Sequence, residues 1–312
     1  MRTKLAGLRA AAHLRVKLEA ELLQELPAEL LLHGADVTLG EKIAKGGSGC
    51  VIVKGMMRAQ VCAVKVLSTK GRLDVLRETK KELVVLGTLQ HVNLLGCLGF
   101  VLGEEWRICM EYCPSTLRDA IQGQCIGLDS DESTGASGQL KGIGQSFEPK
   151  LAGAYALQLA RGIAHLHAAG FVHRDVKPEN LLISTAVDEV LGAPCLKLAD
   201  FGTTKDFRAM AGSAEAKTMP PARCRTNSVC GTPEYFSPLR FAFGESHGFE
   251  TDLWAYGLVL LELLAPRPGT HPWDERLFLT QIEEEVPLSH LCYAHYTRPH
   301  LCYAHHIQLS PH

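Results

Sequence analysis

Residues 173–180 bring together three side chains whose chemistry suits the transfer of a phosphoryl group to an alcohol. Asp175 can accept a hydroxyl proton, Lys177 can neutralise phosphate charge, and Asn180 can offer an amide oxygen to a metal ion. Such a reaction depends mainly on positioning and charge stabilisation, which these residue types on one short loop can supply. The spacing therefore predicts a phosphoryl-transfer site.

Charged residues on either side of this loop could complete such a site. Lys65 ends an alternating apolar stretch that is typical of a strand. Glu82 follows seventeen residues later, on a segment whose apolar residues at positions 83, 86 and 89 form one face of a helix. Asp200 opens an Asp-Phe-Gly sequence directly after a short apolar run. These segments would position a cation, its carboxylate partner and a metal ligand.

Two further segments follow in the same half of the chain. Residues 231–235 read Gly-Thr-Pro-Glu-Tyr, and residues 252–257 begin with Asp252 and include a tryptophan. Together with the segments above, they resemble the motifs of the eukaryotic protein kinases. The resemblance covers roughly residues 37–275, and the chain is identified as a member of that family.

The resemblance implies an α+β, two-lobed protein-kinase-like fold. It would have a small β-rich N-lobe and a larger, mainly helical C-lobe that lacks its last helices. The expected parts are an N-terminal helical flank (1–36), the kinase domain (37–275) made of an N-lobe (37–110) and a C-lobe (111–275) with a flexible insert (122–148), and a divergent His/Cys-repeat tail (276–312).

The resemblance also implies a role for each matching residue, with ATP and Mg²⁺ as cofactors. Asp175 would be the catalytic base and Lys177 would neutralise charge beside it. Lys65 would hold the ATP phosphates, and Glu82 would orient Lys65. Asn180 and Asp200 would bind the metal. The residues expected around the nucleotide are Ile43, Gly46, Gly49, Val51, Ala63, Lys65 and Leu182, with Glu111 and Cys113 at the hinge beside Met110.

The glycine-rich loop departs from the family pattern at two positions. Ala44 stands where the first glycine is usual, and Ser48 stands where an aromatic residue usually caps the loop tip. If position 44 needs a positive φ, alanine would cost about 1 kcal/mol there. A kinase-like scaffold or binding module with impaired catalysis is therefore the alternative to an active enzyme.

The Lys-Pro-Glu sequence after Val176 and the Gly-Thr-Pro sequence around Thr232 resemble serine/threonine kinases. The expected partners are therefore signalling proteins with Ser or Thr acceptors. Thr226 and Ser228 are candidate regulatory phosphosites, and a phosphate on Ser228 would dock on Arg174. The early part of the domain looks more like the tyrosine-kinase-like group, so the subfamily stays open.

The resemblance fades near the C-terminal end of the chain. Leu239 replaces a glutamate that in the family pairs with an arginine, and no counterpart of that arginine is recognisable. A His-Leu-Cys-Tyr-Ala-His sequence occurs at 290–295 and again at 300–305. Its His and Cys could bind zinc or copper, but the copies lack the spaced pairs of a structural zinc site, which favours a disordered tail. A C-lobe without its last helices would expose apolar surface that a partner could cover.

Composition favours an enzyme that acts in the cytoplasm. Lys and Arg number 32 against 34 Asp and Glu, which argues against nucleic acid as a partner. The 11 cysteines are scattered, as is typical of reduced thiols. The longest apolar run, residues 253–265, contains Glu262, is too short to span a membrane and is interpreted as a buried helix.

The N-terminal flank has two interpretations. The basic first 17 residues could target an organelle, but glutamates follow at once, which favours a plain helix. Pro27 should end that helix because proline lacks an N–H group. A leucine repeats every fourth residue, and this stripe could pack on the small lobe or on a partner helix. Its members are Leu18, Leu22, Leu26 and Leu30.

Overall fold

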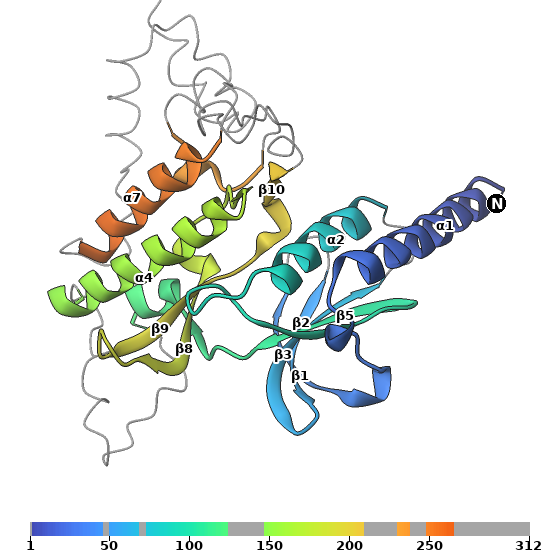
Figure 1. The fold of residues 1–312 in the computed structure, drawn as a ribbon, viewed down its shortest axis with the longest axis horizontal. Coiled ribbons are helices and arrows are strands. Elements are labelled where there is room, and N and C mark those ends of the chain that lie inside the picture. The colour runs from blue at the N-terminus through green and yellow to red at the C-terminus, as the bar shows by residue number, and fades with distance from the viewer. Residues whose placement is uncertain are drawn as a thin grey trace, which may run out of the picture.

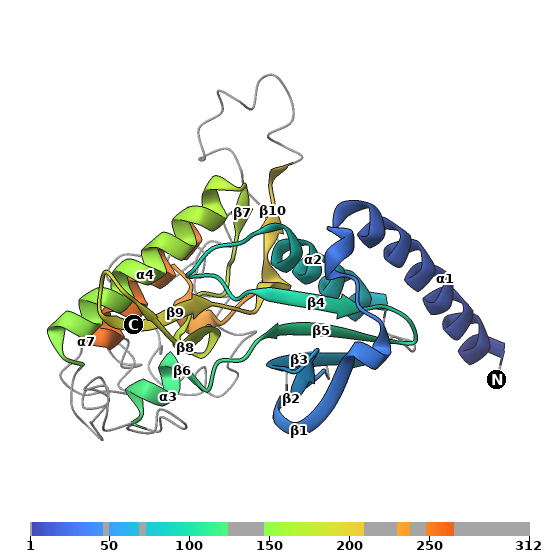
Figure 2. The same cartoon turned by 60° about the horizontal axis from the view of Figure 1, so that its bottom comes forward.

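The smaller lobe is built on one antiparallel sheet. The computed structural model describes residues 2–45, 50–68, 73–123, 147–208, 230–237 and 248–264. Within these residues, five strands pair in the order β1-β2-β3-β5-β4, each antiparallel to its neighbours (Figures 1 and 2). Their bounds are β1 Val37–Lys45, β2 Val51–Met57, β3 Gln60–Ser68, β4 Cys97–Val101 and β5 Glu105–Glu111.

The alternation of β3 positions Lys65. Cys62 and Val64 are buried on one face of the strand, so Ala63 and Lys65 point to the opposite face. Val-rich strands of this kind fit a pleated, half-buried surface. The face that carries Lys65 is the one turned toward the other lobe.

Two helices accompany the sheet. Helix α2 (Leu73–Thr88) packs Leu83 and Leu86 into a core shared with β4 and β5. Helix α1 (Arg2–Glu25) lies beside α2 in both ribbon views (Figures 1 and 2). The helix ends before Pro27, as predicted from the missing N–H group of proline.

The larger lobe is mainly helical. Its long helices, α4 (Pro149–Ala168) and α7 (Glu250–Leu264), pack against each other (Figure 1). The hairpin of β8 (Leu181–Asp188) and β9 (Ala193–Leu198) packs on α4. The remaining short elements are β6 (Ser115–Thr116), α3 (Leu117–Ile121), β7 (Phe171–Val172) and β10 (Lys205–Asp206). A sheet lobe and a helical lobe confirm the predicted fold class.

Asn93 connects the two lobes. It follows α2, and its side-chain amide donates to Gln158 Oε1 of α4 and to the Leu196 carbonyl of β9, each at 3.0 Å. Its own carbonyl accepts from Leu198 N at 2.9 Å. Gly162 of α4 permits this approach, because a Cβ there would lie 2.8 Å from the Asn93 carbonyl oxygen.

The structure bears on the predicted buried helix and on the absence of a membrane span, but not on the segments that it does not describe. Within α7, Leu258, Val259 and Leu263 are buried, but Leu253 and Leu261 are exposed, so this helix is buried along one side rather than all round. No helix in the described part of the chain is long and apolar enough to cross a bilayer. Most of the predicted insert and all of the His/Cys-repeat tail lie outside the described residues, as does Leu239.

Gly162 and Gly153 of α4 allow a matched test of this contact. We expect Gly162→Ala to lower the free energy of unfolding by about 1–3 kcal/mol, because the new methyl group collides with the Asn93 carbonyl. Gly153→Ala should raise it by up to about 1 kcal/mol, because a Cβ there meets nothing within 4 Å and alanine favours the helix. Denaturant titration of both variants measures the difference, and changes of the same sign would contradict the role of Gly162.

Candidate active site

A buried carboxylate shapes the loop that contains Asp175. Asp252, at the start of α7, accepts hydrogen bonds from the backbone N–H groups of His173 at 2.8 Å and Arg174 at 2.7 Å. His167 Nε2 lies 2.7 Å from the same carboxylate. Arg174 has a φ of 69°, a left-handed conformation that costs a non-glycine residue about 1–2 kcal/mol. The hydrogen bonds of Asp252 offset that cost and hold the loop open toward the cleft.

Asp175, Lys177 and Thr232 form a closed hydrogen-bonded cluster. Lys177 Nζ lies 2.8 Å from Asp175 Oδ2 and donates to Thr232 Oγ1 at 2.5 Å. The Thr232 hydroxyl in turn donates to Asp175 Oδ1 at 2.6 Å. Burial alone would raise the pKa of Asp175, but the hydrogen bonds from Lys177 and Thr232 hold it below its ordinary value. Asp175 is therefore a carboxylate at neutral pH, the form that can accept a proton.

Gly231 brings Thr232 to this cluster. Its φ of 97° lies in the left-handed region that favours glycine. A Cβ at this position would collide with the carbonyl oxygen of Arg174. The segment 231–235 can approach the loop closely only because this residue has no side chain.

Asn180 supports Asp175 from the other side. Its side-chain amide donates to the backbone carbonyl of Asp175 at 2.8 Å and to Asp175 Oδ2 at 2.9 Å. Both bonds use the amide nitrogen, which turns the Asn180 side chain so that its oxygen is directed elsewhere. An amide oxygen held in this way is a suitable ligand for a hard cation.

Lys65 and Glu82 form a short ion pair between β3 and α2. Lys65 Nζ lies 2.7 Å and 2.6 Å from the two carboxylate oxygens of Glu82. Burial alone would lower the pKa of Lys65, but the charges of Glu82 and Asp200 raise it above its ordinary value. Lys65 is therefore a fixed cation at the back of the cleft.

Asp200 follows β9 and faces the same cleft. It is exposed and has a φ of 61°. Phe201, next to it, is buried and packs edge-on against the ring of His173. The His173 ring also lies 2.9 Å from the Ala199 carbonyl, so these contacts tie Asp200 to the loop of Asp175.

The cleft between the lobes brings most of the predicted site residues together. Those that line it are Ile43, Ala63, Lys65, Glu82, Met110, Glu111, Cys113, Lys177, Asn180, Leu182 and Asp200. Asp175 adjoins this lining through Lys177 and Asn180. Val51 is not among the lining residues and instead packs opposite Val66 in the sheet. The predicted residues Gly46, Gly49, Thr226 and Ser228 lie outside the described part of the chain.

Ala44 does not have the positive φ that would have made alanine unfavourable at this position. It lies in β1 opposite Ile52. The described non-glycine residues with positive φ are Arg58, Ala59, Arg174 and Asp200. Ala44 therefore bears none of the cost considered above.

The sequence did not reveal a charged network that joins Glu179, in the loop of Asp175, to α3 and α7. Arg118 of α3 donates to Glu262 of α7 at 2.6 Å and to Glu179 at 2.7 Å. The hydroxyl of Tyr235 donates to Glu262 at 2.5 Å, and burial raises the pKa of that tyrosine. Glu262 inside an apolar run was the available signal, but its partners are far away in sequence.

The side chain of Glu111 points away from the expected nucleotide position. Its Oε1 accepts from Gly96 N at 2.6 Å and lies 2.9 Å from Lys197 Nζ. Lys197, on β9, also donates to the Val92 carbonyl at 3.0 Å. The Glu111 side chain therefore ties the hinge to both lobes, and a nucleotide would be bound by the backbone of this residue rather than by its carboxylate. Cys50, which was not predicted as a site residue, also lines the cleft, and burial raises the pKa of its thiol.

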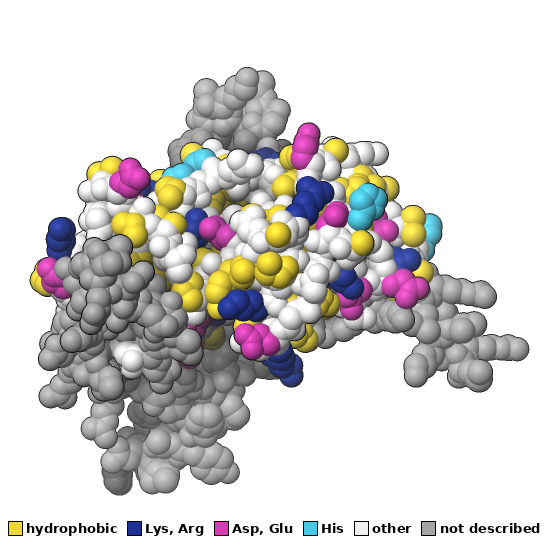
Figure 3. All heavy atoms as spheres, turned by 90° about the horizontal axis from the view of Figure 1, so that it is seen from below, with side chains coloured by type: hydrophobic (Ala, Val, Ile, Leu, Met, Phe, Trp, Pro, Cys, Tyr) yellow, Lys and Arg dark blue, Asp and Glu magenta, His cyan; other side chains and the backbone are white. Residues whose placement is uncertain are grey.

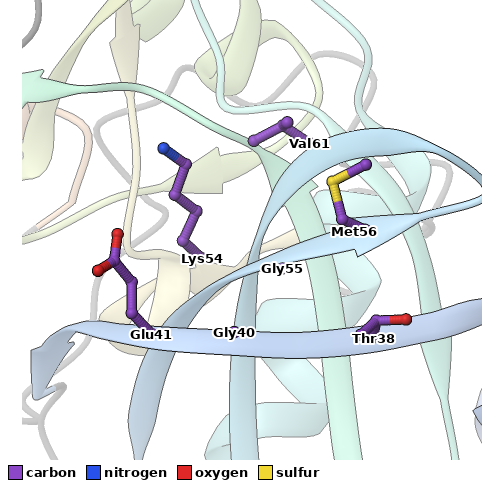
Figure 4. A pocket seen from close by; sticks show the side chains of 7 residues that line it. All are labelled: Thr38, Gly40, Glu41, Lys54, Gly55, Met56 and Val61. Carbon is purple, nitrogen blue, oxygen red and sulfur yellow. The ribbon is translucent and has the colours of Figure 1, made fainter.

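A second hollow lies on the same face of the sheet as Lys65, and Glu41 lines both this hollow and the cleft. Its lining is Thr38, Gly40, Glu41, Lys54, Gly55, Met56 and Val61 (Figure 4). None of the predicted site residues lines it. The described surface seen from below mixes acidic, basic and apolar side chains, without a broad area of one charge sign (Figure 3).

Comparison with known proteins identifies the family. The family model of the protein kinase domain matches residues 37–292, and the chain belongs to this family. The chain is 30% identical over 259 residues to human mitogen-activated protein kinase kinase kinase 4, covering 80% of this chain and 14% of the relative. It is 27% identical over 259 residues to an Aurora kinase of Debaryomyces hansenii, covering 81% and 53%. A serine/threonine-protein kinase of Schizosaccharomyces pombe is 30% identical over 242 residues, covering 75% and 32%. The chain thus spans about half or less of the length of each of these relatives.

Removal of the Thr232 hydroxyl should lower the free energy of unfolding by an amount that depends on pH. The depressed pKa of Asp175 contributes stability above its unfolded value of 3.8, and this contribution is lost as the pH falls through the lower folded value. We expect Thr232→Val to lower the free energy of unfolding by about 1–2 kcal/mol at pH 7, with the difference from wild type narrowing below about pH 4. Denaturant unfolding between pH 3 and pH 7 measures this.

Thr88→Val is the matched control. The Thr88 hydroxyl donates to the neutral Val84 carbonyl, so any cost of its removal should not vary with pH. A pH-independent effect of Thr232→Val would contradict the interaction of its hydroxyl with the Asp175 carboxylate.

Proposed function

We propose that this chain is a protein serine/threonine kinase that transfers the γ-phosphate of ATP to hydroxyl groups of proteins. The observation that supports this most directly is the position of two charged clusters in one cleft. The Lys65–Glu82 pair lies at one side and the Asp175–Lys177–Thr232 cluster at the other. This arrangement provides a fixed cation for phosphates and a proton acceptor for the attacking hydroxyl.

Each residue then has a physical role. Lys65 binds the nucleotide phosphates, and Glu82 keeps its ammonium group in place. Asp175 accepts the proton of the substrate hydroxyl as the oxygen attacks, and its low pKa keeps it ready at neutral pH. Lys177 stabilises the negative charge that spreads over the transferred group. Ile43, Ala63, Leu182 and the backbone of Glu111 and Cys113 would hold the adenosine part of ATP, with Gly46 and Gly49 over its phosphates.

Mg²⁺ fits the donors that the site offers. The amide nitrogen of Asn180 is used by Asp175, so the remaining amide oxygen and the Asp200 carboxylate are the proposed ligands in the cleft. Mg²⁺ is typically held by one or two side chains together with substrate phosphates rather than by an all-protein cage. Once bound, it would neutralise phosphate charge.

The serine/threonine class rests on the Lys-Pro-Glu sequence after Val176 and on Thr232. The Schizosaccharomyces pombe relative is named a serine/threonine-protein kinase, which agrees with this class. Thr226 and Ser228 are the proposed regulatory phosphosites. Arg174, the proposed docking residue, donates through Nε to the Thr203 carbonyl at 2.8 Å.

The cytoplasm is the proposed site of action. Seven described cysteines are free thiols, as expected of a reducing compartment. The proposed substrates are proteins that present Ser or Thr. The scaffold alternative loses one of its arguments, since Ala44 lies in β1 without a positive φ.

Intact-mass analysis with Mg²⁺ and ATP tests the proposal. We expect phosphate additions to wild type, and an initial rate lower by more than about a hundredfold in Asp200→Asn, because removal of a metal ligand weakens charge stabilisation by several kcal/mol. Asp206→Asn, the same exchange at an exposed ion pair with Arg208, is the control and should retain its rate. Wild-type protein that is folded and binds nucleotide but gains no phosphate would favour the scaffold alternative. Mapping of a phosphate to Ser228 would support its regulatory role.

A further inference from the structure

Helix α2 makes ionic contacts on two opposite sides. Glu82 reaches Lys65 of β3 on one side. Lys80 precedes it by two residues, which at about 100° per residue places its side chain on roughly the opposite side of the helix. Lys80 Nζ lies 2.6 Å from Glu21 and 2.7 Å from Glu25, both on α1. The position of Glu82 is therefore determined from both sides of the helix that carries it.

Apolar contacts reinforce the α1 side. Leu22 of α1 is fully buried, and Leu26 directly follows the helix and is also buried. A Cβ on Gly87 of α2 would lie 2.7 Å from the Leu26 side chain, so the two segments pack as closely as a glycine permits. Burial alone would lower the pKa of Lys80, but Glu21 and Glu25 raise it, which keeps Lys80 charged.

Helix α1 is also fixed to the sheet, independently of α2. Glu19 accepts hydrogen bonds from the indole of Trp106 at 2.9 Å and from Gly103 N at 3.1 Å, at the turn between β4 and β5. Trp106 is fully buried. Beyond the helix, Leu32 N donates to the Phe100 carbonyl of β4 at 2.8 Å. Glu19, which contacts the sheet, and Glu21, which contacts α2, are two residues apart on α1. One helix therefore joins the sheet to α2.

We propose that α1 is an intramolecular strut that holds α2 in the position where Glu82 reaches Lys65, and that Lys80 is the positioning residue of this strut. The strut connects the β4–β5 turn to α2, and α2 connects it to the ion pair that orients Lys65. A helix that only covered apolar surface would not need two carboxylates on one cation and a third on a buried indole. The inference rests on the proposed function, because it assigns the Lys65–Glu82 pair its catalytic meaning.

Combining substitutions at Lys80 and Glu82 distinguishes a role of Lys80 in positioning Glu82 from a general role in the stability of the fold. We expect Lys80→Met to lower kcat/KM for ATP about tenfold and to speed hydrogen exchange of α2 amides, since α2 loses one of its two ionic supports. In a Glu82→Gln background, the same substitution should cause no further loss of kcat/KM, because the pair through which it acts is already broken. Lys80→Arg should retain activity, and so should Lys80→Glu combined with Glu21→Lys and Glu25→Lys. Arg77→Met, which removes an exposed cation from the same helix, is the matched control and should change neither readout.

Two results would overturn the strut. One is unchanged α2 exchange and unchanged kcat/KM in Lys80→Met, and the other is an equal further loss in the Glu82→Gln background, which would indicate a general loss of stability. Hydrogen exchange needs no turnover, so it decides the matter even if the wild type transfers no phosphate. Absence of phosphate transfer by the wild type would overturn the proposed function but not the strut.

Discussion

The geometry of the cleft depends on one buried carboxylate. Asp252 satisfies two consecutive backbone N–H groups of the loop that contains Asp175, at His173 and Arg174, which lie 79 and 78 residues away in sequence. Such groups could not be left unpaired in the interior without a cost comparable to that of a lost hydrogen bond. The carboxylate also allows Arg174 to keep its left-handed backbone, which turns the chain so that Asp175 faces the cleft. Helix α7 thus supplies the carboxylate that fixes the backbone conformation of this loop.

The other parts of the site are fitted to this loop by polar contacts from distant segments. Thr203 donates to the His173 carbonyl at 2.9 Å, and Thr232 reaches Asp175. Asn93 joins the small lobe to α4 and β9 by three hydrogen bonds. These bonds are directional and mostly buried, so each specifies one arrangement of its segments rather than a general collapse. Apolar packing supplies most of the stability, and the polar contacts select the geometry.

The sequence predicts the features that depend on short-range patterns. The strand before Lys65, the helix of Glu82 and the break at Pro27 follow from periodicity and from the chemistry of proline, and the structure contains all three. It could not specify which surface the stripe of Leu18 and Leu22 would cover, since both a lobe and a partner helix fitted the pattern. The pairing of Arg118 with Glu262 spans 144 residues, and no local pattern encodes a contact of that length. The backbone conformation of Ala44 could not be predicted either, because the sequence gives the residue type but not the dihedral angle that it adopts.

The tie between Lys197 and Glu111 affects how the lobes can move. This ion pair fastens the first residue of the hinge to β9, while Gly96 fastens the same carboxylate to the small lobe. Bending at Glu111 itself would stretch charged contacts in a partly buried place, so this ion pair opposes rotation of the lobes about the first residue of the hinge. In many enzymes the exit of product limits the turnover rate, so under the proposed function a contact that resists opening at the hinge would slow the release of nucleotide.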